Sequence, residues 1–359
     1  MRVLQLAPLW ERVPPPAYGG IEYVVGVLTD ELVRMGHEVV LTASGDSITT
    51  ARLSSIYHRS LRTAESIADA SPYNWLHVAL AMKEAGSFDL VHNHAGELAM
   101  AMHSLVGVPM LTTLHNLVTT EAALVWRVYR GYYNTPSHAA TASLDHPNFA
   151  GVIYHGIDVE SFPFEENKED YMLFLSRMSP EKGPLEAISV ARRLGKKLVM
   201  AGKVDAKDHE FFWSEVAPLI DGHLVEYRGE ADSRFKRELY AKACCLLFPI
   251  NWNEPFGLVL TEAMACGTPV IAFRSGAAPE VVVDGLAGYV VDDVEGMAEA
   301  VRRVDKLEPR RIRRYVERRF SARAMAAAYV RAYAQVIRAT ESAQRKIWRL
   351  APAPDTLAG

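Results

Sequence analysis

Two glutamates beside a glycine-marked turn form the most informative stretch of the sequence. Glu254 and Glu262 are eight residues apart. The proline that follows Glu254 disfavours helical geometry there, which predicts a loop, whereas Glu262 falls inside the next helix. The junction at Phe256, Gly257 and Leu258 leaves free backbone N–H groups at the positive end of that helix, a suitable place for an anion. A phosphate bound there would have carboxylates beside it that can bind vicinal hydroxyls, as found in ribose and in hexoses.

Two cations and two glycines add to this pattern. Arg177 and Lys182 follow a strand expected at Tyr171–Leu175, at the end where open parallel sheets bind ligands. Arginine offers a forked contact and lysine a point charge, which together suit a diphosphate. In the first half of the chain, Gly19 and Gly20 precede a helix, where the backbone can approach a ligand closely.

Alternating strands and helices must position these residues. Short apolar runs predict strands at Val3–Ala7, Val39–Ala43, Leu90–His92, Met110–Leu114 and Val152–Tyr154, with a helix over Ile21–Met35. The pattern then restarts with strands at Tyr171–Leu175, Lys197–Ala201, Leu224–Tyr227, Cys245–Phe248 and Pro269–Phe273. This alternation predicts two α/β domains with parallel sheets, and a ligand cleft between their carboxyl ends.

The expected domain boundaries follow from this restart and from a polar, acidic stretch near the middle. We expect an acceptor-side domain at 1–157, a linker at 158–170, a donor-binding domain at 171–337, and a helix end and tail at 338–359. The last nine residues, 351–359, have no periodicity and are expected to fray.

Composition excludes several classes of protein. The 359 residues suit two domains, and a net charge of −4 argues against nucleic acid as a partner. Three cysteines cannot form a disulfide framework and suit a reducing compartment, so we expect a cytoplasmic protein. The longest stretch free of charged residues, 98–120, contains Gly-Val-Pro and histidines, so no membrane span is expected. The N-terminal run reads as a first strand and not as a signal peptide.

The combination of motifs resembles the retaining, nucleotide-sugar-dependent glycosyltransferases of family 4. The motifs that carry the resemblance are Glu254-Pro-Phe-Gly with Glu262, Arg177 with Lys182-Gly183, Gly19-Gly20, and Thr113-Leu-His115. It spans about Arg2 to Ile337 and implies the GT-B fold, in which two Rossmann-like domains face each other. We also expect the C-terminal helix to pack back toward the first domain.

The resemblance implies a role for each residue. Glu262 would bind the ribose of the donor nucleotide, and Arg177 and Lys182 would neutralise the leaving diphosphate. Glu254 would hold hydroxyls of the transferred sugar, and His115 would face that sugar from the other domain. The implied reaction moves a hexosyl group from a UDP-, GDP- or ADP-type sugar to a hydroxyl acceptor with retention. No cofactor or metal is expected, because Arg, Lys and the helix dipole replace a cation.

Alternative interpretations remain open at this point. A nucleotide-sugar epimerase could use the same fold, and a non-catalytic nucleotide-sugar-binding protein could use the same pocket. His92 and His94 could hold a metal, but no third ligand has a recognisable spacing. The aromatic run Trp126–Tyr133 reads as an amphipathic helix, with a sugar-stacking surface as the lesser possibility.

The acceptor is inferred from charge. Residues 1–155 contain 9 Lys and Arg against 13 Asp and Glu, without the basic cluster that an anionic membrane requires. We therefore expect a small-molecule, glycan or other neutral hydroxyl acceptor near Gly19, Gly20 and the Trp126–Tyr133 run, with membrane association not favoured. The arginines of Arg310–Arg319 read mainly as a solvated helix face.

Overall fold

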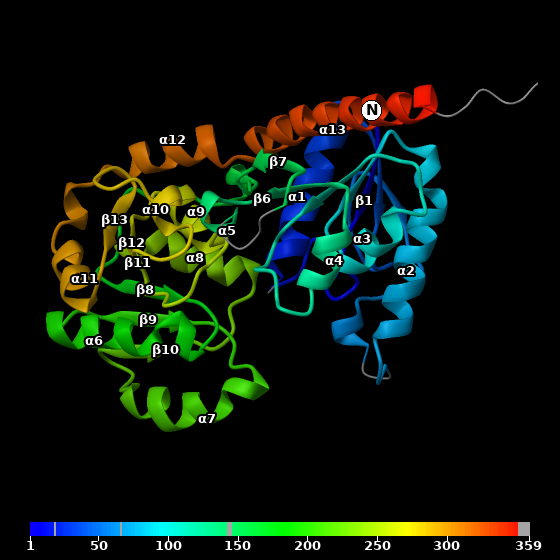
Figure 1. Ribbon diagram of the computed structural model, residues 1–359. Helices are drawn as coiled ribbons and strands as arrows, with labels where there is room; N and C mark the ends of the chain where they lie inside the picture. The colour runs from blue at the N-terminus through cyan, green and yellow to red at the C-terminus, as the bar shows by residue number, and fades with distance from the viewer. Residues whose placement is uncertain (18, 65–66, 142–145, 351–359) are drawn as a thin grey trace, which may run out of the picture.

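The computed structural model describes residues 1–17, 19–64, 67–141 and 146–350, so the expected tail at 351–359 lies outside the described residues. Two parallel sheets flanked by helices form two lobes (Figure 1). We call the lobe built on β1–β7 the first domain and the lobe built on β8–β13 the second domain. The predicted α/β architecture of two Rossmann-like domains is thereby confirmed. In these described ranges, no helix has both the length and the apolar character needed to cross a bilayer.

The first sheet is parallel throughout its described part, with strand order β3-β2-β1-β4-β5-β6-β7. Its strands are β1 (Arg2–Leu6), β2 (Glu38–Thr42), β3 (Arg52–Ser54), β4 (Leu90–Asn93), β5 (Met110–Thr113), β6 (Tyr132–Thr135) and β7 (Phe149–Val152). Its helices are α1 (Gly20–Arg34), α2 (Ser71–Glu84), α3 (Glu97–His103), α4 (Ala123–Val128) and α5 (His138–Thr141). Successive residues of β1 face opposite sides, so Val3 packs with α1 and Leu4 with α2.

The second sheet is also parallel, with strand order β10-β9-β8-β11-β12-β13. Its strands are β8 (Met172–Leu175), β9 (Leu198–Ala201), β10 (Val225–Tyr227), β11 (Cys245–Phe248), β12 (Val270–Phe273) and β13 (Gly288–Val291). Its helices are α6 (Pro184–Leu194), α7 (His209–Phe211), α8 (Ser233–Lys242), α9 (Leu258–Ala265), α10 (Ala278–Val281), α11 (Val294–Val301) and α12 (Pro309–Arg319). The interior strands β11 and β12 are apolar and buried at every position, as expected when helices cover both faces.

The last helix, α13 (Ala322–Leu350), returns to the first domain, which confirms that expectation (Figure 1). The chain crosses between the domains twice at one place, where Ile157 donates to the Phe320 carbonyl over 2.9 Å and accepts from Ala322 over 2.9 Å. From there α13 packs against α1, β5 and β7. Its Tyr329 and Tyr333 are fully buried in the first domain.

The prediction of one helix over Trp126–Tyr133 is wrong. The helix α4 ends at Val128, and Tyr133 belongs to β6. A Cβ at Gly131 would collide with the ring of Tyr129, so glycine permits the sharp change from helix to strand. Trp126, Tyr129 and Tyr133 are at most 3% exposed. These aromatics therefore form core, and the expected acceptor surface at this run is contradicted.

Candidate active site

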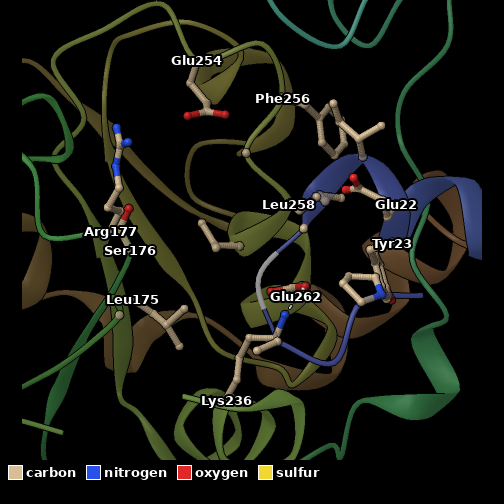
Figure 2. A pocket seen from close by; sticks show the side chains of 18 of the residues that line it. Glu22, Tyr23, Leu175, Ser176, Arg177, Lys236, Glu254, Phe256, Leu258 and Glu262 are labelled. Carbon is tan, nitrogen blue, oxygen red and sulfur yellow. Dashed lines mark hydrogen bonds and ion pairs between the residues drawn. The ribbon is translucent and has the colours of Figure 1, made fainter. Parts of the chain in front are cut away.

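A pocket of about 540 Å³ is lined by residues of both domains. Figure 2 shows Arg177 and Glu254 on one side of it, and Glu22 and Tyr23 of α1 on the other. Every residue predicted for the site contributes to the lining: Gly19, Gly20, His115, Arg177, Lys182, Glu254, Phe256, Gly257, Leu258 and Glu262. The fold thus brings together residues from four separate parts of the sequence, while their individual roles stay predictions.

Lys182 and Glu254 form an ion pair in the pocket wall. Lys182 Nζ donates to Glu254 Oε2 over 2.7 Å and lies 4.7 Å from the centre of the Trp252 ring. Lys182 is followed by Gly183, which has a φ of 75° and would collide with the Pro249 carbonyl if it carried a Cβ. Glycine there lets the loop after β8 approach the loop after β11, so that cation and carboxylate meet.

Glu254 is held in place through its backbone. Its carbonyl accepts from Ala277 N over 2.9 Å. Gly276 has a φ of 51°, and a Cβ there would collide with the Glu254 backbone. The next helix, α10, extends this contact to the first domain, because Glu280 accepts from His138 N over 2.8 Å and Ala139 N over 2.7 Å. The Glu254 loop is therefore tied to both domains.

Arg177 follows β8 and is surrounded by carboxylates. Its guanidinium pairs with Glu181, with Asp205 at 3.2 Å and with Asp208 at 3.6 Å. Lys203 also pairs with Asp205, at 2.8 Å. These carboxylates hold the arginine at the edge of the pocket and offset its charge, so an anion that enters would have to share the guanidinium with them.

Glu262 lies on α9 and is nearly buried, with 4% of its side chain exposed. Lys236 Nζ donates to its Oε1 over 2.7 Å, and Tyr240 Oη donates to its Oε2 over 2.9 Å. Lys236 and Tyr240 are one turn apart on α8, so both face α9. Sequence reasoning missed this pair, and their spacing of four residues was the available signal. Each carboxylate oxygen keeps acceptor capacity for a hydroxyl.

The start of α9 is the predicted anion site. Gly257 caps the helix with a φ of 80°, a left-handed conformation that favours glycine. A Cβ at Gly20, the first residue of α1, would lie 3.5 Å from Leu258 Cδ1. The N-termini of α1 and α9 therefore meet across the pocket, and both direct positive helix ends toward it.

His115 lies in a group of histidines that burial keeps neutral. Burial lowers the pKa of His115 to about 3, and lowers the pKa of His94 and of His155 well below the usual value. The His155 ring stacks on His115 with centroids 5.1 Å apart. Both ring nitrogens of His92 and of His94 are engaged in hydrogen bonds, which does not favour them as metal ligands. Within the described part of the chain, no three His, Cys, Asp or Glu side chains gather as a metal site.

Several first-domain residues of the pocket were not predicted, among them Trp10, Glu11 and Glu22. Trp10 is 55% exposed, whereas Glu11 and Glu22 are buried. Glu11 pairs with Arg62. Burial raises the pKa of Glu22 to about 7. Glu22 comes two residues after Gly20, so its position in the first turn of α1 was a usable signal.

Comparisons with known proteins agree with this architecture. A family model described as glycosyl transferases group 1 matches residues 158–319, and one described as glycosyltransferase family 4 matches residues 18–161. A glycogen synthase of Mycobacterium tuberculosis H37Rv is 27% identical over 364 residues, covering 85% of this chain and 86% of its own. A D-inositol 3-phosphate glycosyltransferase of Frankia alni is 24% identical over 341 residues, covering 76% and 82%.

Solved structures extend the similarity to the whole fold. AviGT4, a glycosyltransferase involved in avilamycin A biosynthesis, is 26% identical with a TM-score of 0.73, covering 94% of this chain and 98% of its own. A sucrose-phosphate synthase from Thermosynechococcus elongatus has a TM-score of 0.78 at 18% identity, covering 94% and 100%. With the pocket described above, these matches show that the chain belongs to the nucleotide-sugar glycosyltransferases of the family 4 type with the GT-B fold.

Proposed function

We propose that this glycosyltransferase transfers a hexosyl group from a nucleotide diphosphate sugar to a neutral hydroxyl acceptor, with retention and without a metal ion. The observation that carries the proposal is the joint placement of two cations, two carboxylates and a helix N-terminus around one pocket. A departing diphosphate gains negative charge, and Arg177, Lys182 and the start of α9 all present positive charge to the same space.

The two carboxylates suit different parts of the donor. Glu262 is rigidly held by Lys236 and Tyr240, so it is suited to the ribose, which does not react. Glu254 sits beside Lys182, where the sugar and the phosphate would join. Binding of the donor would draw Lys182 toward the phosphate and free a Glu254 oxygen for sugar hydroxyls. Retention is supported by the resemblance of these motifs to the retaining family 4.

The acceptor side is formed by the first domain. Glu11, Glu22 and Trp10 lie near Gly19 and Gly20 in the pocket wall, a surface with carboxyl groups and an aromatic ring. Carboxyl groups and aromatic rings suit the hydroxyls and faces of a sugar or of a similar neutral molecule. The described cysteines are free thiols, which fits the reducing conditions of the cytoplasm, where we place the enzyme.

One experiment separates this function from its alternatives. The purified protein is incubated with UDP-, GDP- and ADP-sugars, with glycan and small-molecule hydroxyl acceptors, in EDTA. The proposal expects acceptor-dependent release of nucleotide diphosphate and a product whose NMR coupling shows the donor's anomeric configuration. An epimerase would instead change the sugar while leaving it attached to the nucleotide. A non-catalytic binder would show a thermal shift with donor but no turnover, and inversion would contradict the proposed stereochemistry.

A further inference from the structure

A chain of buried hydrogen bonds connects α13 to the ring of His115 in the pocket. Gln5 Nε2 lies 3.1 Å from Tyr333 Oη, and Gln5 Oε1 lies 2.9 Å from His94 Nε2. His94 Nδ1 then lies 2.8 Å from His115 Nε2. Tyr333 and Gln5 are fully buried and His94 is 3% exposed. A tyrosine of the last helix is therefore linked to a side chain that lines the pocket.

Each hydrogen bond in this series has a defined donor and a defined acceptor. The Gln5 amide donates to Tyr333 Oη, so the tyrosine's own proton points to His92 Nδ1, 2.7 Å away. The Gln5 carbonyl can only accept, so His94 carries its proton on Nε2 and accepts on Nδ1. It follows that His115 donates from Nε2. Because burial keeps the pKa of His115 low, the ring is neutral and its Nδ1 has no proton.

A second set of hydrogen bonds begins at His92, and its donors and acceptors are consistent with this assignment. With Nδ1 of His92 accepting, its Nε2 must donate, and Thr113 Oγ1 lies 2.8 Å away as the acceptor. Thr113 Oγ1 in turn donates a hydrogen bond to Asn134 Oδ1 over 2.9 Å. Asn134 Nδ2 donates to Tyr329 Oη over 3.3 Å, and Tyr329 Oη lies 3.0 Å from Thr113 Oγ1, which can still accept. Each group in the branch thus finds a partner of the opposite role.

We propose that Tyr333, Gln5 and His94 are positioning residues that fix the tautomer of His115, so that its Nδ1 accepts a hydrogen bond from a donor-sugar hydroxyl. This rests on the proposed function, since it needs a sugar in the pocket. His115 lines the pocket, and its Nδ1 makes no hydrogen bond to any residue that the structure describes. A ring fixed in this way selects for a hydroxyl and against a fluorine at the contacted carbon, because fluorine cannot donate.

The tautomers can be observed without activity. Spectra of protein with ¹⁵N-labelled histidine distinguish protonated from unprotonated ring nitrogens. The wild type should show His94 and His115 with the proton on Nε2, and Tyr333→Phe should show His115 as a mixture, because Gln5 and His92 each lose a partner. A wild-type proton on His115 Nδ1, or unchanged tautomers in Tyr333→Phe, would overturn the proposal.

The selectivity arm uses donors in which one hydroxyl is replaced by fluorine. The series is made from UDP-glucose, GDP-mannose or ADP-glucose, whichever the enzyme turns over. Fluorine at one position of the donor sugar should lower the kcat/KM of the wild type roughly tenfold relative to the unmodified donor. The same fluorine should lower the kcat/KM of Tyr333→Phe about twofold. The matched control is Tyr315→Phe, since Tyr315 is also a buried hydroxyl but donates to the Val281 carbonyl over 3.0 Å in the second domain.

The control should keep the wild-type selectivity. If Tyr333→Phe discriminates as strongly as Tyr315→Phe does, the positioning role is wrong. If none of the three donors is turned over, the proposed function fails, while the spectra still decide whether the hydrogen-bonded chain fixes His115.

Discussion

Replacing Lys182 by Met tests how the pocket handles the leaving diphosphate. Lys182 Nζ is paired with Glu254 and lies over the Trp252 ring, and 16% of the side chain is exposed. Methionine keeps the length and the apolar contact with that ring, so the fold should persist. Loss of one preorganised charge at the departing group costs about 3–4 kcal/mol. At about 1.4 kcal/mol per tenfold, kcat/KM should fall between roughly a hundredfold and a thousandfold.

A second variant separates the two possible causes of that loss. Without Lys182, the partly buried Glu254 carboxylate also loses its counterion, which by itself could disturb the loop. The double variant Lys182→Met/Glu254→Gln removes this problem but still lacks the cation. We expect it to be no more active than Lys182→Met alone. Recovery to near the wild-type rate would show that Lys182 only neutralises Glu254 and would refute the diphosphate role.

The assay is steady-state release of nucleotide diphosphate. Lys197→Met serves as the control, because Lys197 pairs with Glu226 at 3.0 Å and does not line the pocket. This variant should stay within about twofold of the wild type. Equal activities of the Lys182 and Lys197 variants would also contradict the prediction.

Glu262→Gln should raise the donor KM more than it lowers kcat, and Glu254→Gln should do the reverse; identical kinetic signatures would end that division of roles. Because the buried Glu22 keeps its proton to about pH 7 while the unfolded chain releases it near 4.5, its contribution to stability is complete below pH 4.5 and lost as the pH rises through 7. In urea unfolding, the free energy of unfolding of Glu22→Gln relative to that of the wild type should therefore increase by about 2–3 kcal/mol between pH 5 and pH 8. A difference that stays constant with pH would contradict this prediction. EDTA should leave turnover unchanged, and restoration of lost activity by a divalent ion would disprove metal independence. Co-sedimentation with anionic vesicles should be weak at physiological salt. Strong co-sedimentation that depends on the arginines of α12 would contradict the neutral-acceptor proposal.

The sequence predicted the interior strands apart from β6, and among the edge strands it predicted β10. The strands β11 and β12 are continuous apolar runs, as expected in a sheet covered on both faces. By contrast, β3 was missed because it contributes three partly exposed residues, and β13 because it begins with glycine. The strand expected at Val152–Tyr154 is at Phe149–Val152, because Gly151 interrupts the apolar run and its first residues were not recognised as a strand. The predicted boundary at residues 158–170 stays a prediction.

The residues of the site also differ in whether local sequence or tertiary packing determines their position. Glu254, Gly257 and Glu262 were visible because their order along one loop and helix carries the chemistry. Lys236 was missed because its role arises from packing between α8 and α9, and its spacing of four residues from Tyr240 was the one local signal. Tyr333 lies 328 residues from Gln5, and no local pattern could join two such positions. Local motifs therefore identified residues that line the pocket, while the contacts that orient their side chains required the fold.

The most direct test of the central claim is a crystal structure with the nucleotide diphosphate that the enzyme releases. We expect the β-phosphate between Arg177, Lys182 and the start of α9, with the ribose hydroxyls on Glu262 and with Lys182 drawn away from Glu254. A nucleotide bound elsewhere, or one whose phosphates do not contact Arg177 and leave Lys182 paired with Glu254, would contradict this prediction.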